Sequence, residues 1–171
     1  MFCANDIFSS VEERVTISND IVIFIGKINK IFFKDYIEKY DSDFYEPLSS
    51  RVNLEAYSEK ISNLSTTFVI VYKNNIAGLI ASYFYDKASL NGFITLVHIK
   101  SEYRGLKLSS HLVKTIQHYT KKIKFNTLSL VVYKNNISAY ILYSKCGFNV
   151  INEEAGKCTM NWNWRTIEQL Q

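Results

Sequence analysis

The pattern of hydrophobic and polar positions predicts three consecutive strands in the middle of the chain. Two runs rich in β-branched and aromatic residues flank the pair Asn74-Asn75, and a third run follows the polar stretch DKASLNG. Asparagine tolerates the positive φ that a tight hairpin turn requires. We therefore expect an antiparallel meander with strands at 67–73, 76–85 and 92–99.

The N-terminal part is expected to hold a short strand at 14–18 and two helices. From Ile21 onwards, apolar residues recur at helical spacing, which favours a first helix, although the β-branched cluster at 21–23 argues against it. A loop with the only proline, Pro47, follows. Asn53 is a typical N-cap residue, so the second helix is expected to begin there.

Helices and strands alternate in the C-terminal part. We expect a helix from Gly105 to about Lys121, a strand at Thr127–Tyr133, a helix closed by Gly147, and two last strands in FNVI and CTMNWNW. The strand–helix–strand unit after the meander makes the sheet mixed. The expected fold class is therefore α/β, with a central mixed, mostly antiparallel sheet of about six or seven strands and about four flanking helices. No repeat or linker divides the chain, so a single domain is expected over residues 1–171.

Composition narrows the class of protein. With 47% hydrophobic residues, six glycines and one proline, the chain is expected to be compact and globular. Its net charge of +4 is too small to indicate a nucleic-acid partner, but it suits one anionic ligand. The cysteines, at 3, 146 and 158, form no metal-binding spacing, so free thiols in a reducing cytosol are expected. Neither a secretory signal nor a membrane-spanning run is recognisable, which favours a soluble, cytoplasmic protein without a membrane partner.

A basic loop joins the third strand of the meander to the next helix. It contains Arg104, Gly105, Lys107 and Ser109. The N-terminus of a helix presents unpaired backbone N–H groups and a partial positive charge, and glycine lets a ligand approach the backbone closely. The loop is therefore a candidate anion site. The alternative is that its serines only start the helix and its cations are solvated.

Two segments of the chain are IKSEYRGLKLS and NNISAYILYSKCGF. Both resemble signatures of the GNAT superfamily of acyl-CoA-dependent N-acyltransferases. IKSEYRGLKLS resembles the pyrophosphate loop R/Q-x-x-G-x-G/A, with Lys107 in place of a glycine and Ser109 in place of Gly or Ala. NNISAYILYSKCGF resembles a second signature, N-x-x-A-x-x-L-Y-x-K-x-G-F, and the matching residues are Asn136, Ala139, Leu142, Tyr143, Lys145, Gly147 and Phe148. The resemblance implies a GNAT-like fold along nearly the whole chain.

The resemblance also implies acetyl-CoA as cosubstrate, with no metal. Backbone N–H groups of the basic loop would hold the pyrophosphate, and the strand before it would pair with the pantetheine arm, to which Asn136 would also bind. Tyr143 would be the general acid that protonates the leaving thiolate, the alternative being a core tyrosine. The cofactor-binding residues implied are Val97, His98, Ile99, Arg104, Gly105, Leu106, Lys107, Leu108, Ser109, Asn136 and Tyr143.

No side chain is assigned as general base. GNAT enzymes often place Glu or His on the strand before the loop, but the matching positions here are Phe93 and Thr95. By strand alternation, His98 lies on the opposite face, where a structural role is favoured. Asp43 and Glu46 are weaker candidates, so a water molecule or an amine that arrives neutral is preferred.

The segment between the two early helices is expected to wall the acceptor site. DFYEPLSSRVNLEAYSEKI resembles a stretch found in bacterial GNAT proteins that are associated with surface polysaccharide and amino-sugar pathways. Tyr45, Ser49, Ser50 and Arg51 are assigned to the acceptor, although Arg51 could instead pair with Glu46 or Glu55.

The expected activity is acetyl transfer to an amine of an amino sugar or its nucleotide-linked form. The alternatives are a peptide N-terminus, lysine or polyamine as acceptor, a non-catalytic acyl-CoA-binding module, or a structural domain that binds no CoA. Dimers are common in the superfamily, so a homodimer is one expected assembly.

Overall fold

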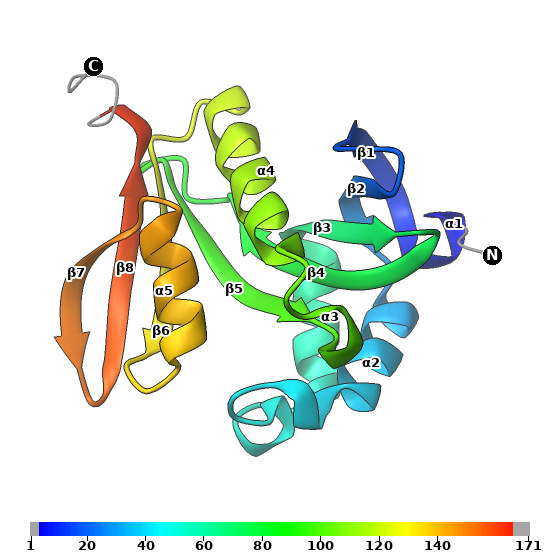
Figure 1. Cartoon of the computed structure of the whole chain (residues 1–171), viewed down its shortest axis with the longest axis horizontal. Helices are drawn as coiled ribbons and strands as arrows, with labels where there is room; N and C mark the ends of the chain where they lie inside the picture. The colour runs from blue at the N-terminus through cyan, green and yellow to red at the C-terminus, as the bar shows by residue number, and fades with distance from the viewer. Residues whose placement is uncertain (1–3, 166–171) are drawn as a thin grey trace.

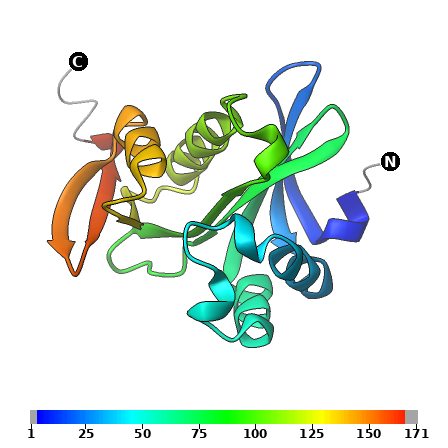
Figure 2. The same cartoon turned by 60° about the horizontal axis from the view of Figure 1, so that its bottom comes forward.

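The computed structural model describes residues 4–165, which form an eight-stranded mixed sheet and five α-helices. The strand order is β1-β2-β3-β4-β5-β6-β8-β7, and only β5 and β6 are parallel. In Figure 1 and Figure 2, α4 and α5 cover one face of the twisted sheet, and α2 and α3 cover the other. In chain order the elements are α1 Ala4–Ile7, β1 Phe8–Thr16, β2 Ile21–Ile28, α2 Lys30–Lys39, α3 Leu54–Leu64, β3 Ser65–Tyr72, β4 Asn75–Tyr83, β5 Asn91–Ile99, α4 Leu108–Lys122, β6 Thr127–Tyr133, α5 Ile137–Lys145, β7 Asn149–Glu154 and β8 Lys157–Asn163.

The helix expected from Ile21 is a prediction that the structure corrects. Ile21–Ile28 is strand β2, which pairs with both β1 and β3. Its β-branched residues favour the extended backbone, and this preference outweighs the helical spacing. The helix starts only at Lys30, after Asn29, whose side chain accepts hydrogen bonds from the first turn. The first strand is also longer than expected. β1 is an exposed edge strand, so its sequence lacks the hydrophobic alternation from which its full length could have been predicted.

The meander and the C-terminal elements agree with the sequence-based expectations. The hairpin between β3 and β4 turns at Lys73 and Asn74, with φ of 47° and 62°, so the turn lies one residue earlier than expected. Asn53 caps α3 by accepting a hydrogen bond from Ala56 N. Gly147 has a φ of 84°, as a residue that closes a helix requires.

Two hydrophobic cores lie on opposite faces of the sheet. The first lies under α4 and α5 and includes Phe68 and Leu112, and the second lies under α2 and α3 and includes Phe33 and Val69. Phe68 and Val69 are neighbours on β3 and point to opposite faces, as strand geometry requires. Both faces of the central strands are thus buried.

Two further expectations concern the cysteines and membrane-spanning helices. Cys146 and Cys158 are free, while Cys3 lies outside the described residues. Across residues 4–165, no helix combines the length and the apolar character that a membrane span needs.

Candidate active site

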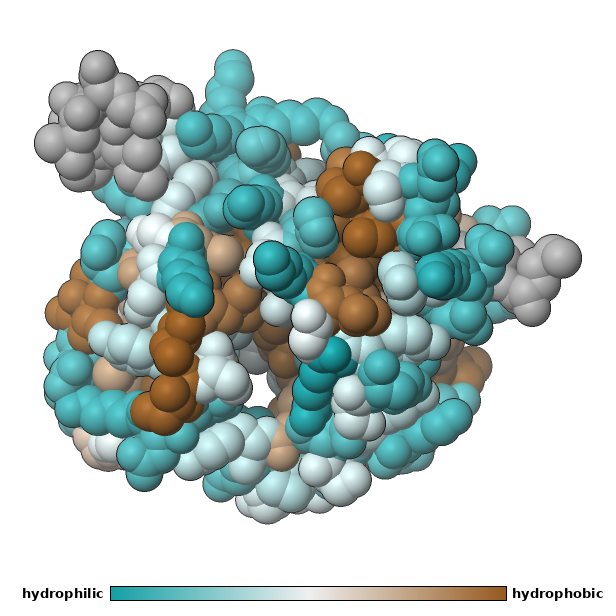
Figure 3. All heavy atoms as spheres, in the orientation of Figure 1, coloured by the Kyte–Doolittle hydropathy of each residue, from teal (hydrophilic) through white to brown (hydrophobic). Residues whose placement is uncertain are grey.

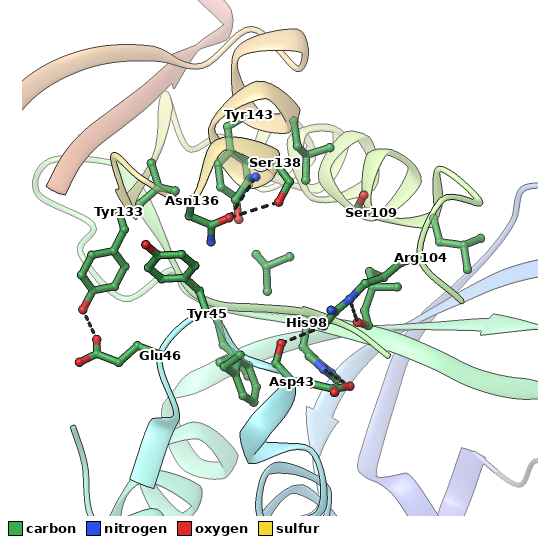
Figure 4. Close-up of a pocket in the computed structure, with 18 of the residues that line it drawn as sticks. Asp43, Tyr45, Glu46, His98, Arg104, Ser109, Tyr133, Asn136, Ser138 and Tyr143 are labelled. Carbon is green, nitrogen blue, oxygen red and sulfur yellow. Dashed lines mark hydrogen bonds and ion pairs between the residues drawn. The ribbon is translucent and has the colours of Figure 1, made fainter. Parts of the chain in front are cut away.

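The candidate site is a cavity of about 530 Å³ that opens where β5 and β6 diverge. The two strands pair only between Asn91–Ile94 and Thr127–Leu130. Beyond these residues both strands continue without pairing to each other, and Figure 4 shows one side chain from each, His98 and Tyr133, pointing to the segment after α2. One edge of β5 is therefore left with backbone groups that have no strand partner there.

Backbone geometry identifies which groups of β5 face this gap. Lys100 N donates to Ala77 O at 2.9 Å, so Lys100 is oriented toward β4. Because backbone orientation alternates along a strand, Val97 and Ile99 point their N–H and C=O groups to the other side, into the gap. Ile99 O is indeed reached by the Arg104 side chain, whose Nε donates to it at 3.1 Å.

A β-bulge in β5 changes which side chains share a face. Ile94 pairs with Ser82 and Leu96 with Ala81, which leaves Thr95 as an extra residue. One extra residue reverses the alternation that follows it. His98 therefore lies on the α2 side of the sheet, the same side as Phe93, and the sequence-based assignment of His98 to the opposite face is wrong.

His98 is buried between α2 and the loop that follows it. Its Nδ1 lies 2.7 Å from the Tyr36 hydroxyl. Burial raises the pKa of Tyr36 well above its usual value, so the phenol keeps its proton, and the tautomer of His98 decides which of the two groups donates. The other ring nitrogen, Nε2, faces Asp43 Oδ2 at 3.5 Å, too far for a good hydrogen bond.

Burial lowers the pKa of His98 to about 4, against the opposing pull of Asp43. The imidazole is thus neutral near pH 7. Because Tyr36 engages one ring nitrogen and the pKa is lowered, His98 is a weak base for accepting a proton from an amine. The geometry indicates a positioning role for His98 beside the cavity.

The basic loop, which is expected to bind an anion, leads into the start of α4. Gly105 has a φ of 84°, with open space around it, and Lys107, the N-cap residue, has a left-handed φ of 60°. Lys107 makes no side-chain cap, while the N–H groups of Ser110 and His111 bond back to Lys107 O. Arg104, Gly105, Lys107, Leu108 and Ser109 line the cavity, whereas the side chain of Leu106 is 46% exposed and does not.

Asn136 and Tyr143 approach the cavity from α5 (Figure 4). Asn136 Oδ1 caps the helix by accepting from Ala139 N at 3.4 Å, so its amide N–H groups stay available to a ligand. The buried ring of Tyr143 packs against Phe148, with 5.8 Å between ring centroids. Burial raises the pKa of Tyr143 above its usual value, which keeps the phenol protonated.

Residues 43–46, here called the bridging loop, contact both sides of the gap. On one side, Arg104 donates from Nη2 to Asp43 O at 2.8 Å, and Asp43 Oδ2 accepts from Ser101 N at 3.3 Å. On the other side, Tyr133 of β6 donates to Glu46 and lies 5.4 Å from Tyr45, measured between ring centroids. Figure 2 shows this segment, between α2 and α3, reaching toward the point where β5 and β6 separate.

The four residues assigned to the acceptor fall into two groups. Tyr45 and Arg51 line the cavity, and Arg51 Nε lies 3.4 Å from Glu46 Oε2, so the pairing considered as its alternative is present. Ser49 and Ser50 do not line it. Their hydroxyls are used locally, by Asp41 Oδ2 at 2.5 Å and by Pro47 O at 2.7 Å.

Tyr133 and Ser138 are among the cavity residues that sequence reasoning did not identify. Tyr133 ends β6, and Ser138 lies one turn before Leu142 on α5. Ser138 occupies an unspecified position within the α5 signature, and a tyrosine at a strand end is common, so neither carried a distinguishing signal.

Comparison with known proteins decides the family. A family model described as the acetyltransferase (GNAT) family matches residues 27–148, which is well over half of the chain. The chain belongs to the GNAT family. This assignment confirms the expected class of enzyme, an acyl-CoA-dependent N-acetyltransferase with acetyl-CoA as cosubstrate.

Solved structures share the GNAT fold at low sequence identity. The PaiA N-acetyltransferase from Thermoplasma acidophilum, in complex with coenzyme A, is 17% identical with a TM-score of 0.64, and the match covers 82% of this chain and 98% of that one. The ribosomal-protein-S18-alanine N-acetyltransferase from Escherichia coli is 16% identical with a TM-score of 0.65, covering 82% and 93%. A spermidine N-acetyltransferase chimera from Vibrio cholerae is 17% identical with a TM-score of 0.67, covering 84% and 96%. No curated protein matches the sequence.

Proposed function

We propose that this GNAT protein transfers an acetyl group from acetyl-CoA directly to a primary amine of a small acceptor. The observation that carries the proposal is the gap between β5 and β6, which brings free backbone groups, the start of α4 and the phenol of Tyr143 to one cavity. An amino sugar or a nucleotide-linked amino sugar is the acceptor class we propose first.

The cavity suits the cosubstrate in charge and in shape. Arg104 and Lys107 supply positive charge beside the first turn of α4, and Gly105 leaves the backbone open to a diphosphate. The backbone groups of Val97 and Ile99 can pair with the amides of an extended pantetheine arm, and the Asn136 amide can donate to it. For Ile99 O to accept such a bond, Arg104 Nε must release it.

Acetyl-CoA supplies an activated thioester, and the residues of the cavity handle charge and protons. We assign Tyr143 as the acid that donates its phenolic proton to the departing thiolate. The N–H of Val97 faces the gap and can stabilise the oxyanion that forms when an amine attacks. Cys146 follows Tyr143 by three residues but does not line the cavity, which favours direct transfer over a covalent intermediate on cysteine.

The proton of the amine needs an acceptor. Asp43 and Glu46 are carboxylates that line the cavity, and Glu46 is held by Tyr133 and Arg51. We assign the removal of this proton to a water molecule held by these carboxylates, or to one of them directly.

Two features support an amino sugar as acceptor. Tyr45 is 56% exposed beside the cavity, so its ring is accessible for stacking on a sugar. Arg51 contributes a cation to the lining, which suits a nucleotide phosphate if the ligand displaces Glu46. The homodimer is an expectation from the superfamily alone. We also propose a cytoplasmic location, where free thiols such as Cys146 and Cys158 persist.

A second class of acceptor is favoured by a specific observation. The carboxylates of Asp43 and Glu46 give the bridging loop negative charge, and the hydroxyls of Ser49 and Ser50 are directed to local partners. This arrangement suits a cationic acceptor, such as a polyamine or a peptide amine.

An acceptor panel tests the proposal and separates the two classes. CoA thiol release from acetyl-CoA is measured with amino sugars, nucleotide-linked amino sugars, polyamines and peptides, with the matching amine-free sugars as controls. We expect release that saturates with an amino sugar and not with its amine-free control. Release with polyamines or peptides alone would replace the proposed acceptor class while keeping the enzyme.

A further inference from the structure

A second concave surface lies on the other side of α4 and shares no lining residue with the candidate active site. This groove, between α4 and the β1–β2 hairpin, has a volume of about 390 Å³. Its floor contains Val15, Ile17 and Ile25. Figure 3 shows hydrophobic residues gathered at this place and framed by hydrophilic ones.

The floor of the groove and the wall formed by α4 differ in chemistry. Val15 on β1 and Ile17, which directly follows this strand, both line the groove. On α4, His111, Lys114 and His118 are three and four residues apart, which places them on one face of the helix. The apolar floor thus faces a wall of basic side chains on α4.

Most of this basic wall is not neutralised by the protein itself. At one end, Lys122 Nζ pairs with Glu13 Oε2 at 2.7 Å, and the Tyr119 hydroxyl donates to Glu12. Within residues 4–165, His111, Lys114 and His118 have no ion pair or hydrogen bond with an aspartate or glutamate. Positive charge and exposed apolar surface therefore occur together.

This combination selects a class of ligand. An anionic amphiphile complements both the apolar floor and the basic α4 wall, whereas a polyanion would leave the floor uncovered and a neutral lipid would form no ion pair with Lys114. The α4 wall runs from residue 111 to residue 122, which at 1.5 Å per residue is roughly 16 Å. A single extended alkyl chain fits a groove of this length and volume.

We propose that the groove binds a free fatty carboxylate, with its alkyl chain along Val15, Ile17 and Ile25 and its carboxylate at Lys114. The two histidines flank the carboxylate and add hydrogen-bond donors. Because the groove and the candidate active site are lined by different residues, this binding does not depend on the proposed acetyl transfer.

Calorimetry with decanoate, below its micellar concentration, tests the proposal directly. We expect saturable binding at one site per chain, and no binding of decyltrimethylammonium, which has the same chain and the opposite charge. Lys114→Glu should weaken decanoate binding roughly fivefold or more, because it reverses the charge that pairs with the carboxylate. Lys87→Glu, an equal charge change at an exposed lysine in the turn between β4 and β5, should leave it unchanged.

A second variant tests the apolar floor. Ile17 is already 37% exposed, so Ile17→Asn should leave the fold intact, as circular dichroism will show, while weakening decanoate binding. Equal binding of both amphiphiles, or binding only to anionic vesicles, would overturn the proposal. A dimer that Ile17→Asn dissociates, together with no decanoate binding, would instead show that a second copy covers the groove and would also overturn it.

Discussion

The hydroxyl of Tyr133, at the end of β6, donates a hydrogen bond to Glu46 in the bridging loop. These residues are 87 positions apart, and their contact ties one diverging strand to the segment after α2. On the other side of the gap, Asp43 holds the same loop to Arg104. The loop therefore closes one end of the cavity, which we assign to the acceptor.

Removing the Tyr133 hydroxyl should affect the acceptor and leave the cosubstrate alone. In Tyr133→Phe we expect KM for the amine to rise about three- to tenfold, the range for one lost hydrogen bond to a charged group. The Kd for acetyl-CoA should stay unchanged. Steady-state kinetics and calorimetry measure the two values. Tyr85→Phe, at a tyrosine that is 62% exposed and outside the cavity, is the matched control. A change confined to acetyl-CoA binding would remove the bridging loop from the acceptor site.

Tyr143 should act in the chemical step. In Tyr143→Phe we expect kcat to fall by about 100-fold or more, because the thiolate would leave without its acid. The Kd for acetyl-CoA should change little, since the ring is kept. Tyr140→Phe, on the same helix but not lining the cavity, should retain kcat. Equal kcat in Tyr143→Phe and the parent enzyme would exclude Tyr143 from catalysis.

His98 should make folding stability depend on pH. Its pKa is about 4 in the folded protein, below the usual histidine value of 6.5. Between these values the unfolded chain binds more protons, so stability is fully present above pH 6.5 and falls as the pH drops toward 4. The slope from this residue is at most about 1.4 kcal/mol per pH unit. Urea unfolding at a series of pH values should show a shallower slope in His98→Gln. An identical slope in both proteins would mean that His98 does not titrate as described.

Lys107 should carry backbone strain that glycine would relieve. Lys107 and Lys124 have φ of 60° and 62°, in the left-handed region that favours glycine. Each substitution by glycine should raise the free energy of unfolding by about 1 kcal/mol or less, after the entropy cost of glycine. Only Lys107→Gly should also weaken the salt dependence of acetyl-CoA binding, since it removes a cation from the cavity. The same salt dependence in both variants would separate Lys107 from the anion site.

Local signals predicted the elements that carry the signature residues. β6 was predicted with its bounds and the end of α5 was located by Gly147, whereas α4 begins at Leu108 and not at the predicted Gly105. The N-terminal error has a local cause, because Phe24, Ile25 and Ile28 satisfy a helical spacing while they belong to a buried strand. A strand between two other strands is apolar on both faces, so its alternation is weak.

Other features depend on partners that are distant in sequence. The extra residue at Thr95 exists only in the register between β5 and β4, so alternation along β5 alone placed His98 on the wrong face. The contact between Tyr133 and Glu46 requires the whole sheet to be formed. The left-handed φ of Lys107 likewise contradicts the ordinary preference of lysine and follows from the loop conformation.

The most direct test follows a labelled acetyl group from acetyl-CoA to the acceptor by mass spectrometry, using the best amine of the panel. The account predicts one acetyl group on the amine nitrogen for each CoA released, and a rate that collapses in Tyr143→Phe. Tight binding of acetyl-CoA without labelled product on any amine would contradict it, and would indicate a protein that binds the cosubstrate without transferring its acetyl group.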